Sequence, residues 1–520
     1  MIAISALGGN QAAINLAHSM GDDICIDCPV TITTADTWPK GKIYHFSGDG
    51  ALNPCAGIIL TIRGTVKAAR WRNFPANTPS PNHIFGGEGN VIGLLKAYPG
   101  YWGAKEDGIS DDQPALQAAH DCVAASKGSD GEGWAEIILS PSIYGIGNKF
   151  EITPTGSVPI KMRGSGATGD PAFGGTAFKC LAVFTGNVAL HLQGQSTWNT
   201  EHIAGWDIGD FNIIRDAQSP AQFGFWCGGD ADGLNLVGSQ QSLIENVYVN
   251  VFDVTWRFQQ IRLATIRRCS GWSNTNVCIE FAVPDARLFT GDMDFRECQF
   301  VANRQAATTT ANIYIHGTGG AINGVRFYGC QFYQSDVAIN VNSGGVQIAD
   351  WWFRDCQFDS VNKMFSICMT SSASQIFDWH ISGCYGQGLT GPFVVTSISG
   401  GAVLQDVFIE GNWIRGAELG SQNLLSFAGS VAGIHVSNNM FVACRTTSYL
   451  IVFASVATEL DVSHNTVRAY NGSTASHLIA FGANSNRYVA VGNKSSPGYW
   501  TAAPVLELKP TATKYIAGNF

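Results

Sequence analysis

The stretch FRDCQF at residues 353–358 recurs almost unchanged, as FRECQF at 295–300 and FYGCQF at 327–332. Aligning the chain on the Cys of this hexapeptide gives a ladder of single residues spaced 26 to 32 positions apart. A regular period of this length is typical of a solenoid, in which each repeat forms one coil. The ladder consists of Cys269, Cys298, Cys330, Cys356, Cys384, Asn412, Asn439, Asn465 and Asn493, with Asn246 as a less clear earlier member.

The residues around each ladder position predict a sharp corner between two strands. The third residue before the ladder position is always apolar, and the residue just before it is often Gly or Asn, as at Gly329 and Asn438. Gly and Asn tolerate a left-handed backbone, which lets a strand turn within one residue. We therefore expect the ladder residue to point inward, where Cys packs as a small apolar group and Asn bonds to its copies in adjacent coils. No helical periodicity accompanies the repeat, so the solenoid is predicted to be built of strands.

Composition excludes several classes of protein. Charged residues make up 14% of the chain and the net charge is −9, which argues against a nucleic acid partner because a phosphate polymer needs a basic face. No run of eighteen apolar residues is present, so no membrane span is expected. The first twenty residues lack a basic segment followed by an apolar block, so no signal peptide is evident. Without that signal, the 14 cysteines are expected to be buried thiols more than disulfides.

One segment carries a family resemblance. Residues 101–147 begin YWGAKEDGISDDQPALQAAHDC and end IILSPSIYGIG. This stretch resembles the entry segment of the pectate-lyase-like superfamily of parallel β-helices, which phage tailspikes and polysaccharide depolymerases often carry. The expected Gly of the strand end is missing in SPSIYG. The matching residues are Trp102, Gly103, Asp107, Gly108, Asp111, Asp112, Gln117 and Ala118.

The resemblance and the repeat together imply an all-β fold, a right-handed single-stranded parallel β-helix. We expect an N-terminal β module at 1–100, the β-helix at 101–495 and a C-terminal closing segment at 496–520. A capping helix is expected at about 111–126, with Asp111 at its N-cap, covering the open end of the coil. The acidic residues of this segment are interpreted as structural, because Asp107-Gly108 is turn chemistry.

A candidate site follows from counting outward positions on the second strand of each repeat. The count places polar side chains in one column on successive coils, as expected of a surface that binds and cleaves a sugar polymer. An outward polar column can also occur by chance on any solvated sheet. The column consists of Trp226, Arg257, Glu280, His316 and Asn340, followed by Cys368.

The acids near this column allow two reactions. Glycoside hydrolysis needs two carboxyl groups, and we predict Glu280 with Asp253, expected about 5 Å away, or with Asp336, expected about 10 Å away. The first spacing suits a retaining pair and the second an inverting pair. A lyase would instead use Arg257 to neutralise a uronate carboxylate and His316 as the base. Hydrolysis is the first choice and β-elimination the alternative, and a third possibility is a glycan-binding spike or adhesin without catalysis.

The remaining expectations concern partners. A second outward ladder runs beside the corner, flanked by Arg267, Arg296 and Arg354, and either holds glycan rings or forms a subunit interface. Interface is favoured, because tailspike-like helices usually form parallel trimers, so a homotrimer on a virion or outside the cell is expected. The members of this ladder are Gln299, Gln331, Gln357, Tyr385 and Trp413.

No cofactor or metal is expected, and Asp230 and Asp232 either border the cleft or are turn residues.

Overall fold

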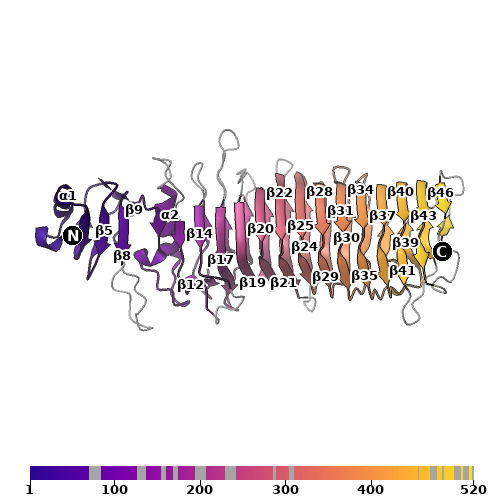
Figure 1. Ribbon diagram of the computed structural model, residues 1–520, viewed down its shortest axis with the longest axis horizontal. Coiled ribbons are helices and arrows are strands. Elements are labelled where there is room, and N and C mark those ends of the chain that lie inside the picture. The colour runs from indigo at the N-terminus through magenta and orange to yellow at the C-terminus, as the bar shows by residue number, and fades with distance from the viewer. Residues whose placement is uncertain are drawn as a thin grey trace. The chain divides into compact units, whose positions relative to one another are not determined.

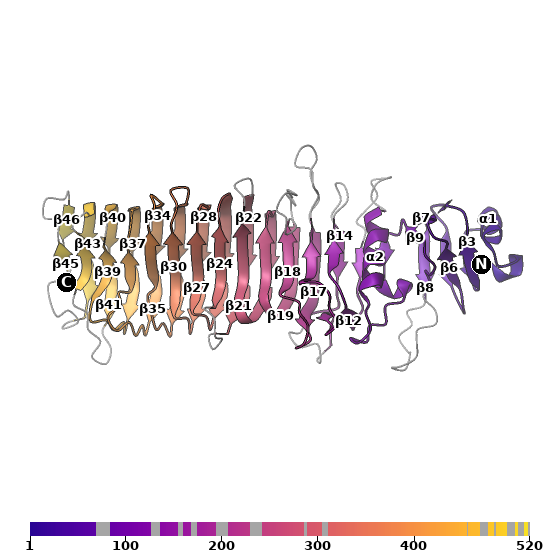
Figure 2. The ribbon, with the colours of Figure 1, turned by 180° about the vertical axis from the view of Figure 1, so that it is seen from behind.

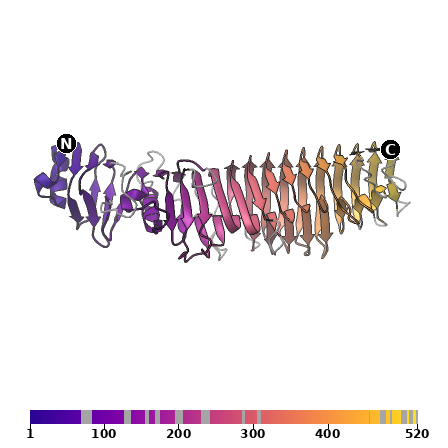
Figure 3. The same cartoon turned by 90° about the horizontal axis from the view of Figure 1, so that it is seen from below.

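The computed structural model describes residues 1–68, 84–125, 136–153, 160–167, 174–193, 206–228, 242–284, 289–303, 310–454, 456–468, 477–482, 485–496, 505–507 and 514–517. Their contacts divide the chain into two units. Unit 1 comprises Met1–Ala221 with Ser239–Tyr248, and unit 2 comprises Gln222–Gly238 with Val249–Phe520. Figure 1 gives the element labels, and Figures 2 and 3 show the same ribbon from behind and from below. No helix in the described ranges is long and apolar enough to cross a membrane.

Unit 1 begins with a small parallel solenoid. Its strands run in three parallel sheets, so the chain visits each sheet once per coil. Alternate residues point inward, and the buried ones include Ile24, Tyr44 and Trp38. Helix α1 (Gln11–Met20) follows the first strand of these coils, and its N-cap Asn10 accepts the Ala13 amide. The sheets are β1 (Ile2–Ala3), β2 (Asp23–Ile26), β5 (Ile43–Phe46) and β8 (Thr65–Ala68); β3 (Pro29–Ile32) and β6 (Ala51–Pro54); and β4 (Asp36–Trp38), β7 (Ile59–Ile62) and β9 (Asn90–Ile92).

Larger coils follow in unit 1 after a short helix. Strand β14 pairs in parallel with β11 before it and β17 after it, and β15 pairs likewise with β12 and β17. The described elements are β10 (Lys96–Ala97), the 3-10 helix η2 (Pro99–Trp102), α2 (Gln113–Ala125), β11 (Glu136–Ile138), β12 (Ile143–Ile146), β13 (Phe150–Ile152), β14 (Ile160–Arg163), β15 (Ala177–Cys180), β16 (Val188–Leu192) and β17 (Trp206–Arg215).

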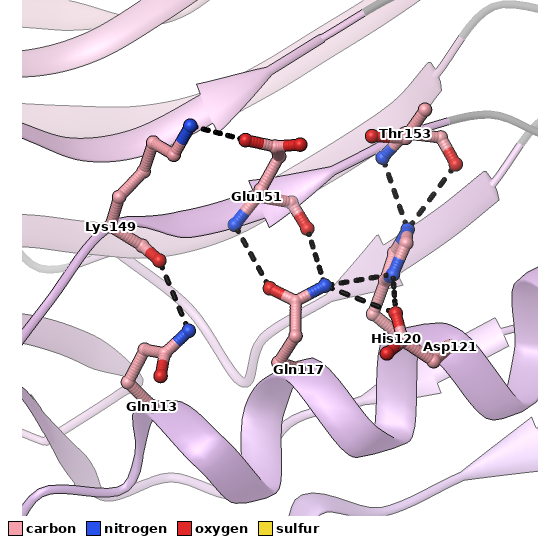
Figure 4. Close-up of polar contacts among 7 residues, drawn as sticks. All are labelled: Gln113, Gln117, His120, Asp121, Lys149, Glu151 and Thr153. Carbon is pink, nitrogen blue, oxygen red and sulfur yellow. Dashed lines mark hydrogen bonds and ion pairs between the residues drawn. The ribbon is translucent and has the colours of Figure 1, made fainter.

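Helix α2 is the predicted capping helix, and its side chains bond to the edge of β13 (Figure 4). The Gln113 side chain donates to the Lys149 carbonyl, and the Gln117 carboxamide exchanges two hydrogen bonds with the Glu151 backbone. The Thr153 amide donates to Nε2 of His120 at 3.1 Å.

The helix and the strand can bond at three successive positions because the spacing of the side chains along α2 is close to the spacing of alternate residues along the strand. Positions 113, 117 and 120 lie on one helix face, about 4.5–6 Å apart along the axis at 1.5 Å per residue. Positions 149, 151 and 153 are alternate residues of an extended strand, about 6.6 Å apart. Polar side chains of the helix therefore supply the partners that another strand would give, and the first coil has no open edge there. Helix α2 begins at Gln113, so the N-cap position belongs to Asp112, one residue later than predicted, and Asp111 accepts the Gln113 amide at 3.1 Å from the position before it.

Unit 2 repeats a coil of three strands. Sheet 1 consists of β20 (Arg262–Arg267), β22 (Phe289–Arg296), β25 (Ala321–Tyr328), β28 (Gln347–Arg354), β31 (Gln375–Ser382), β34 (Val403–Glu410), β37 (Val431–Ser437), β40 (Ala457–Ser463), β43 (Ser485–Val491) and β46 (Lys514–Ala517). Sheet 2 consists of the start of β21 (Ser270–Val283), β23 (Gln299–Ala302), β26 (Gln331–Tyr333), β29 (Gln357–Asp359), β32 (Tyr385–Gln387), β35 (Trp413–Arg415), β38 (Met440–Val442), β41 (Thr466–Arg468) and β44 (Lys494–Ser495). Sheet 3 consists of β18 (Phe223–Gly228), the end of β19 (Ser242–Gln259), the end of β21, β24 (Ala311–Gly317), β27 (Val337–Ser343), β30 (Lys363–Met369), β33 (Val394–Ile398), β36 (Leu425–Phe427), β39 (Tyr449–Phe453), β42 (His477–Phe481) and β45 (Val505–Glu507).

The predicted corner lies between sheets 1 and 2. Gly329 and Asn438 take the expected left-handed conformation, but so do larger residues at the same position, such as Arg268 and Glu297. The ladder residues that follow them are buried. The prediction that Asn246 is a ladder residue was wrong. Asn246 is half-buried and has the left-handed conformation of the residue before the ladder position, and the inward residue is Val247.

The two halves of the ladder satisfy the same backbone group. The thiol of Cys356 donates to the Phe327 carbonyl at 3.4 Å, and the side-chain amide of Asn439 donates to the Ile409 carbonyl at 2.8 Å. Both carbonyls belong to the residue three positions before the ladder residue of the preceding coil. Asn439 also donates to Oδ1 of Asn465, so the amides form the predicted chain from coil to coil. All 14 cysteines are free thiols, and ten of them are buried as predicted, whereas Cys55 is exposed and Cys25, Cys28 and Cys368 are half-buried.

The ladder predicts unequal costs for two substitutions. Asn439→Ala leaves the Ile409 carbonyl and the Asn412 backbone amide unpaired inside the coil, and the Asn412 side-chain amide keeps only its bond to the Ile381 carbonyl. We expect a loss of roughly 3 kcal/mol or more in unfolding free energy. Cys356→Ala removes one weak thiol donor and is expected to cost about 1 kcal/mol. Chemical denaturation measures both, and equal losses would contradict the role given to the amide chain.

Asp112, at the start of α2, carries a buried carboxyl group. It accepts the amides of Lys105 at 2.7 Å and Glu106 at 3.1 Å, and it is 2% exposed. Burial raises the pKa of Asp112 to about 7, against the hydrogen bonds from the two amides, which lower it.

This shift predicts how stability depends on pH. Below pH ~4 the group is protonated in both the folded and unfolded states, and between pH ~4 and 7 only the unfolded state has ionised. The free energy of unfolding is therefore expected to fall as pH rises through this interval, by at most about 1.4 kcal/mol per unit. Asp112→Asn should flatten this slope in thermal unfolding between pH 4 and 8, whereas Asp49→Asn, at an exposed turn, should keep it. An unchanged slope in Asp112→Asn would show that another group causes it.

Candidate functional site

The first part of the site is a cation held against an aromatic ring. Trp226 on β18 and Arg257 on β19 face each other in register. The guanidinium carbon of Arg257 lies 4.2 Å from the ring centre of Trp226 and 4.9 Å from that of Phe223. Burial lowers the pKa of Arg257, and the nearby Glu280 carboxylate opposes that shift. The arginine, 19% exposed, is thus a largely covered cation that needs a counter-charge.

Glu280 on β21 supplies that counter-charge. Its Oε2 forms an ion pair with Nε of Arg257 at 3.4 Å, and its Oε1 lies 2.8 Å from Nε2 of His316. The Glu280 side chain is 12% exposed, whereas that of His316 is 33% exposed. The carboxylate is therefore mostly covered, and the imidazole is the most exposed of the three side chains.

The register corrects the predicted column. Glu280 faces Tyr314 on β24, and His316 faces Ala282, so Glu280 and His316 belong to neighbouring outward columns. The diagonal hydrogen bond between them still brings the two side chains together. Tyr314 was missed by sequence reasoning, and its ring stacks on that of His316 with centres 4.7 Å apart and planes at 20°. Strand alternation marks it, because residues 314 and 316 lie on the same face.

Two amides extend the site to the next coil. Asn340 on β27 faces Tyr314, and Asn342 faces His316. Cys368 lies one coil further in the column of His316, opposite Asn342. The predicted residues Trp226, Arg257, Glu280, His316 and Asn340 therefore do gather on the outer face of sheet 3, in two columns instead of one.

The two predicted aspartates lie elsewhere along the strands. Asp253 is four residues before Arg257, which is about 13 Å along an extended strand. Asp336 precedes β27, and its carboxylate accepts the Thr310 amide at 3.0 Å, level with the start of the strand and not with Glu280. The separations of about 5 and 10 Å from Glu280 are thus not supported by the register. Asp230 and Asp232 lie outside the described residues.

An apolar cluster borders the polar group. Val254, Val277 and Ala311 are at most 9% exposed and pack together with the half-buried Phe223 and Tyr314. They occupy the start of the same strands, three residues before the polar column. The site therefore joins an apolar shelf to a charged and hydrogen-bonding centre, an arrangement suited to a sugar chain with both ring faces and polar substituents.

The buried ion pair predicts strong coupling between its two members. Arg257→Met leaves the carboxylate of Glu280 without its cation, and we expect this variant to lose about 2–4 kcal/mol of unfolding free energy. Adding Glu280→Gln should recover part of that loss, with a coupling energy of about 1–3 kcal/mol in a double-mutant cycle. The control is Arg296 with Asp294, which are 2.7 Å apart but with Arg296 51% exposed, and their coupling should stay below about 1 kcal/mol. Equal coupling in both pairs would contradict this account.

Comparisons with known proteins concern the fold. No protein-family model matches the chain, and no curated protein matches its sequence. Among solved structures, tailspike protein 3 of bacteriophage CBA120 is 14% identical, with 81% of this chain and 61% of that chain covered and a TM-score of 0.48. The A-module of mannuronan C-5 epimerase AlgE4 from Azotobacter vinelandii is 14% identical, with 80% and 99% covered and a TM-score of 0.42. A mannuronic acid specific polysaccharide family 6 lyase from human gut microbiota is 9% identical, with 80% and 91% covered and a TM-score of 0.42. At these values the likeness says nothing of activity, whereas the strand register of the chain itself is that of the expected fold. The pairing of each strand with its counterpart in the next coil makes the described part of the chain a parallel β-helix.

Proposed function

We propose that the chain binds an acidic polysaccharide along the outer face of sheet 3 and cleaves it by β-elimination at His316. The observation that supports this most is the hydrogen bond of 2.8 Å between Nε2 of His316 and Oε1 of Glu280. A carboxylate accepting at Nε2 favours the tautomer protonated there, which leaves Nδ1 with its lone pair. An oriented imidazole that meets solvent is suited to act as a general base.

Each neighbour has a role in this reaction. His316 takes the proton beside the uronate carboxyl group, and the bond from the sugar carbon to the leaving oxygen breaks as the double bond forms. Tyr314, stacked beside the imidazole, is the group placed to protonate the leaving oxygen. Asn340 and Asn342 are one coil away and can donate to the uronate carboxylate. Arg257 stays paired with Glu280 and holds that side chain in position, so it acts through Glu280 and not on the substrate.

Hydrolysis is less well supported by this arrangement. It requires two carboxyl groups separated by about 5–5.5 Å or 6.5–9.5 Å across the scissile bond. In the described part of the chain, Glu280 lies with a cation and an imidazole, and Asp253 and Asp336 lie toward the starts of their strands. The expected homotrimer and the expected virion or extracellular location stay predictions attached to this proposal.

The test separates the two reactions and the binding spike. The purified chain is incubated with polygalacturonate, alginate and hyaluronate, and reducing ends and ultraviolet absorbance of a new conjugated double bond are followed together. Elimination produces both signals. His316→Ala is expected to lower the rate by about 10²–10⁴-fold, and Glu280→Gln by less, because the carboxamide oxygen still accepts from Nε2.

The matched control is His380→Ala. His380 also contacts a carboxylate through Nε2, at 2.8 Å from Oδ1 of Asp378, but it lies on the outer face of sheet 1. Its rate should equal that of the unchanged protein. Reducing ends without absorbance would replace elimination by hydrolysis, and retention of a polymer with neither signal would replace both by a binding spike.

A further inference from the structure

The outer face of sheet 2 carries a second row of polar and aromatic groups that the proposed reaction does not use. Gln299, Gln331 and Gln357 face one another on successive coils, followed by Tyr385 and Trp413. Neighbouring coils lie about 4.8 Å apart, so this row repeats at close to the length of one hexose residue. We name these five residues, with Asp359 and Gln387, the sheet 2 strip.

The amides of the strip are available to a ligand. The carboxamides of Gln299, Gln331 and Gln357 make no hydrogen bond to any residue within the described ranges. In contrast, Gln387 in the next column is fixed in place: it accepts from the Tyr385 hydroxyl at 2.7 Å and donates to Asp359 at 2.6 Å. The strip thus combines free carboxamides with an ordered polar chain, and both can bond to hydroxyl groups.

Trp413 offers the strip an open aromatic surface. It is 48% exposed, and its ring plane stands at 79° to that of Tyr385 with centres 5.6 Å apart. The outer face of sheet 1 differs, because there Trp352, His380, Phe408 and His435 stack with planes within 11° and cover one another. Within that stack the facing sides of neighbouring rings cover each other, whereas a sugar packs on an open ring face.

Two exposed arginines at the border of the strip can recognise an acidic ligand, although the carboxylates of Glu297, Asp355 and Asp359 lie beside them. Arg296 and Arg354 lie at the last position of sheet 1, directly before the corner that leads into the strip. They are 51% and 62% exposed, and each contacts a single carboxylate, of Asp294 and Asp355. Arginine recognises carboxylates by paired hydrogen bonds, which suits the uronate groups of an anionic sugar chain.

The size of the strip argues against a second copy of the chain. Strands of three residues are about 10 Å long, and five coils extend about 24 Å, so the face offers roughly 240 Å². A stable protein interface buries about 800 Å² on each partner. From the free amides, the open Trp413 ring and the arginine border, we propose that the sheet 2 strip is a second, non-catalytic binding site for an anionic polysaccharide lying along the coil axis. It rests on no step of the elimination proposed for sheet 3.

Affinity electrophoresis tests the strip apart from the site on sheet 3. All proteins carry His316→Ala, and the gels contain polygalacturonate, alginate, hyaluronate or neutral dextran. An acidic polymer is expected to retard the parent, and Trp413→Ala and Gln331→Ala should each weaken that retardation by about tenfold in apparent affinity. The control Tyr515→Ala removes another exposed aromatic residue, 63% exposed on β46, and should change nothing.

Three outcomes would overturn the proposal. Retardation that survives both strip substitutions would place binding elsewhere, and absence of retardation by every acidic polymer would remove the anionic glycan as the ligand. A change of oligomeric state in Trp413→Ala, measured by sedimentation velocity, would make the face a subunit interface. The failure of cleavage at sheet 3 leaves this test intact, because the strip is measured by binding alone.

Discussion

Every coil of unit 2 depends on one corner in which a left-handed residue is followed by an inward Cys or Asn. Between sheet 1 and sheet 2 a single residue takes a left-handed backbone conformation, which costs about 1–2 kcal/mol for a residue with a Cβ. Arg268, Glu297 and Asp355 accept this cost. The residue that follows compensates, because a buried thiol or amide pairs a carbonyl of the coil before it. The positions of sheets 2 and 3, and therefore of both surfaces proposed to bind polysaccharide, follow from this turn.

The corner could be predicted from the sequence. The alignment of residues between neighbouring strands of sheet 3 could be predicted only in part. The hexapeptide around Cys330 repeats because few residues suit the corner. Every coil needs the same kinds of residue there, so the corner appears in the sequence as a regular repeat. In β24 the strand begins at Ala311, but Asn312 interrupts the apolar pattern, since it is buried and donates to the Phe300 and Tyr333 carbonyls. Counting from Ile313 therefore moved the column by two residues, from Tyr314 to His316.

The sequence predicted that Arg257, Glu280 and His316 belong to one site. It did not predict which of their side-chain atoms contact each other. Alternation fixes which face a side chain occupies, so all three were expected outside. It does not fix the diagonal contact, which depends on how far a long side chain leans along the axis. Asp253 and Glu280 were predicted to be close because they lie on neighbouring coils. They are far apart because they lie at different positions along their strands.

The chain of amides from Asn412 to Asn493 has a direction, because each side chain donates to Oδ1 of the next. Every coil in that region offers its successor the same donors and receives the same acceptor. The number of coils in this part of the molecule can therefore change. If a whole coil is inserted or removed there, the flanking coils still present the same hydrogen-bonding groups to each other. Growth of the solenoid at that end and chemistry on sheet 3 near Glu280 can then evolve independently of each other.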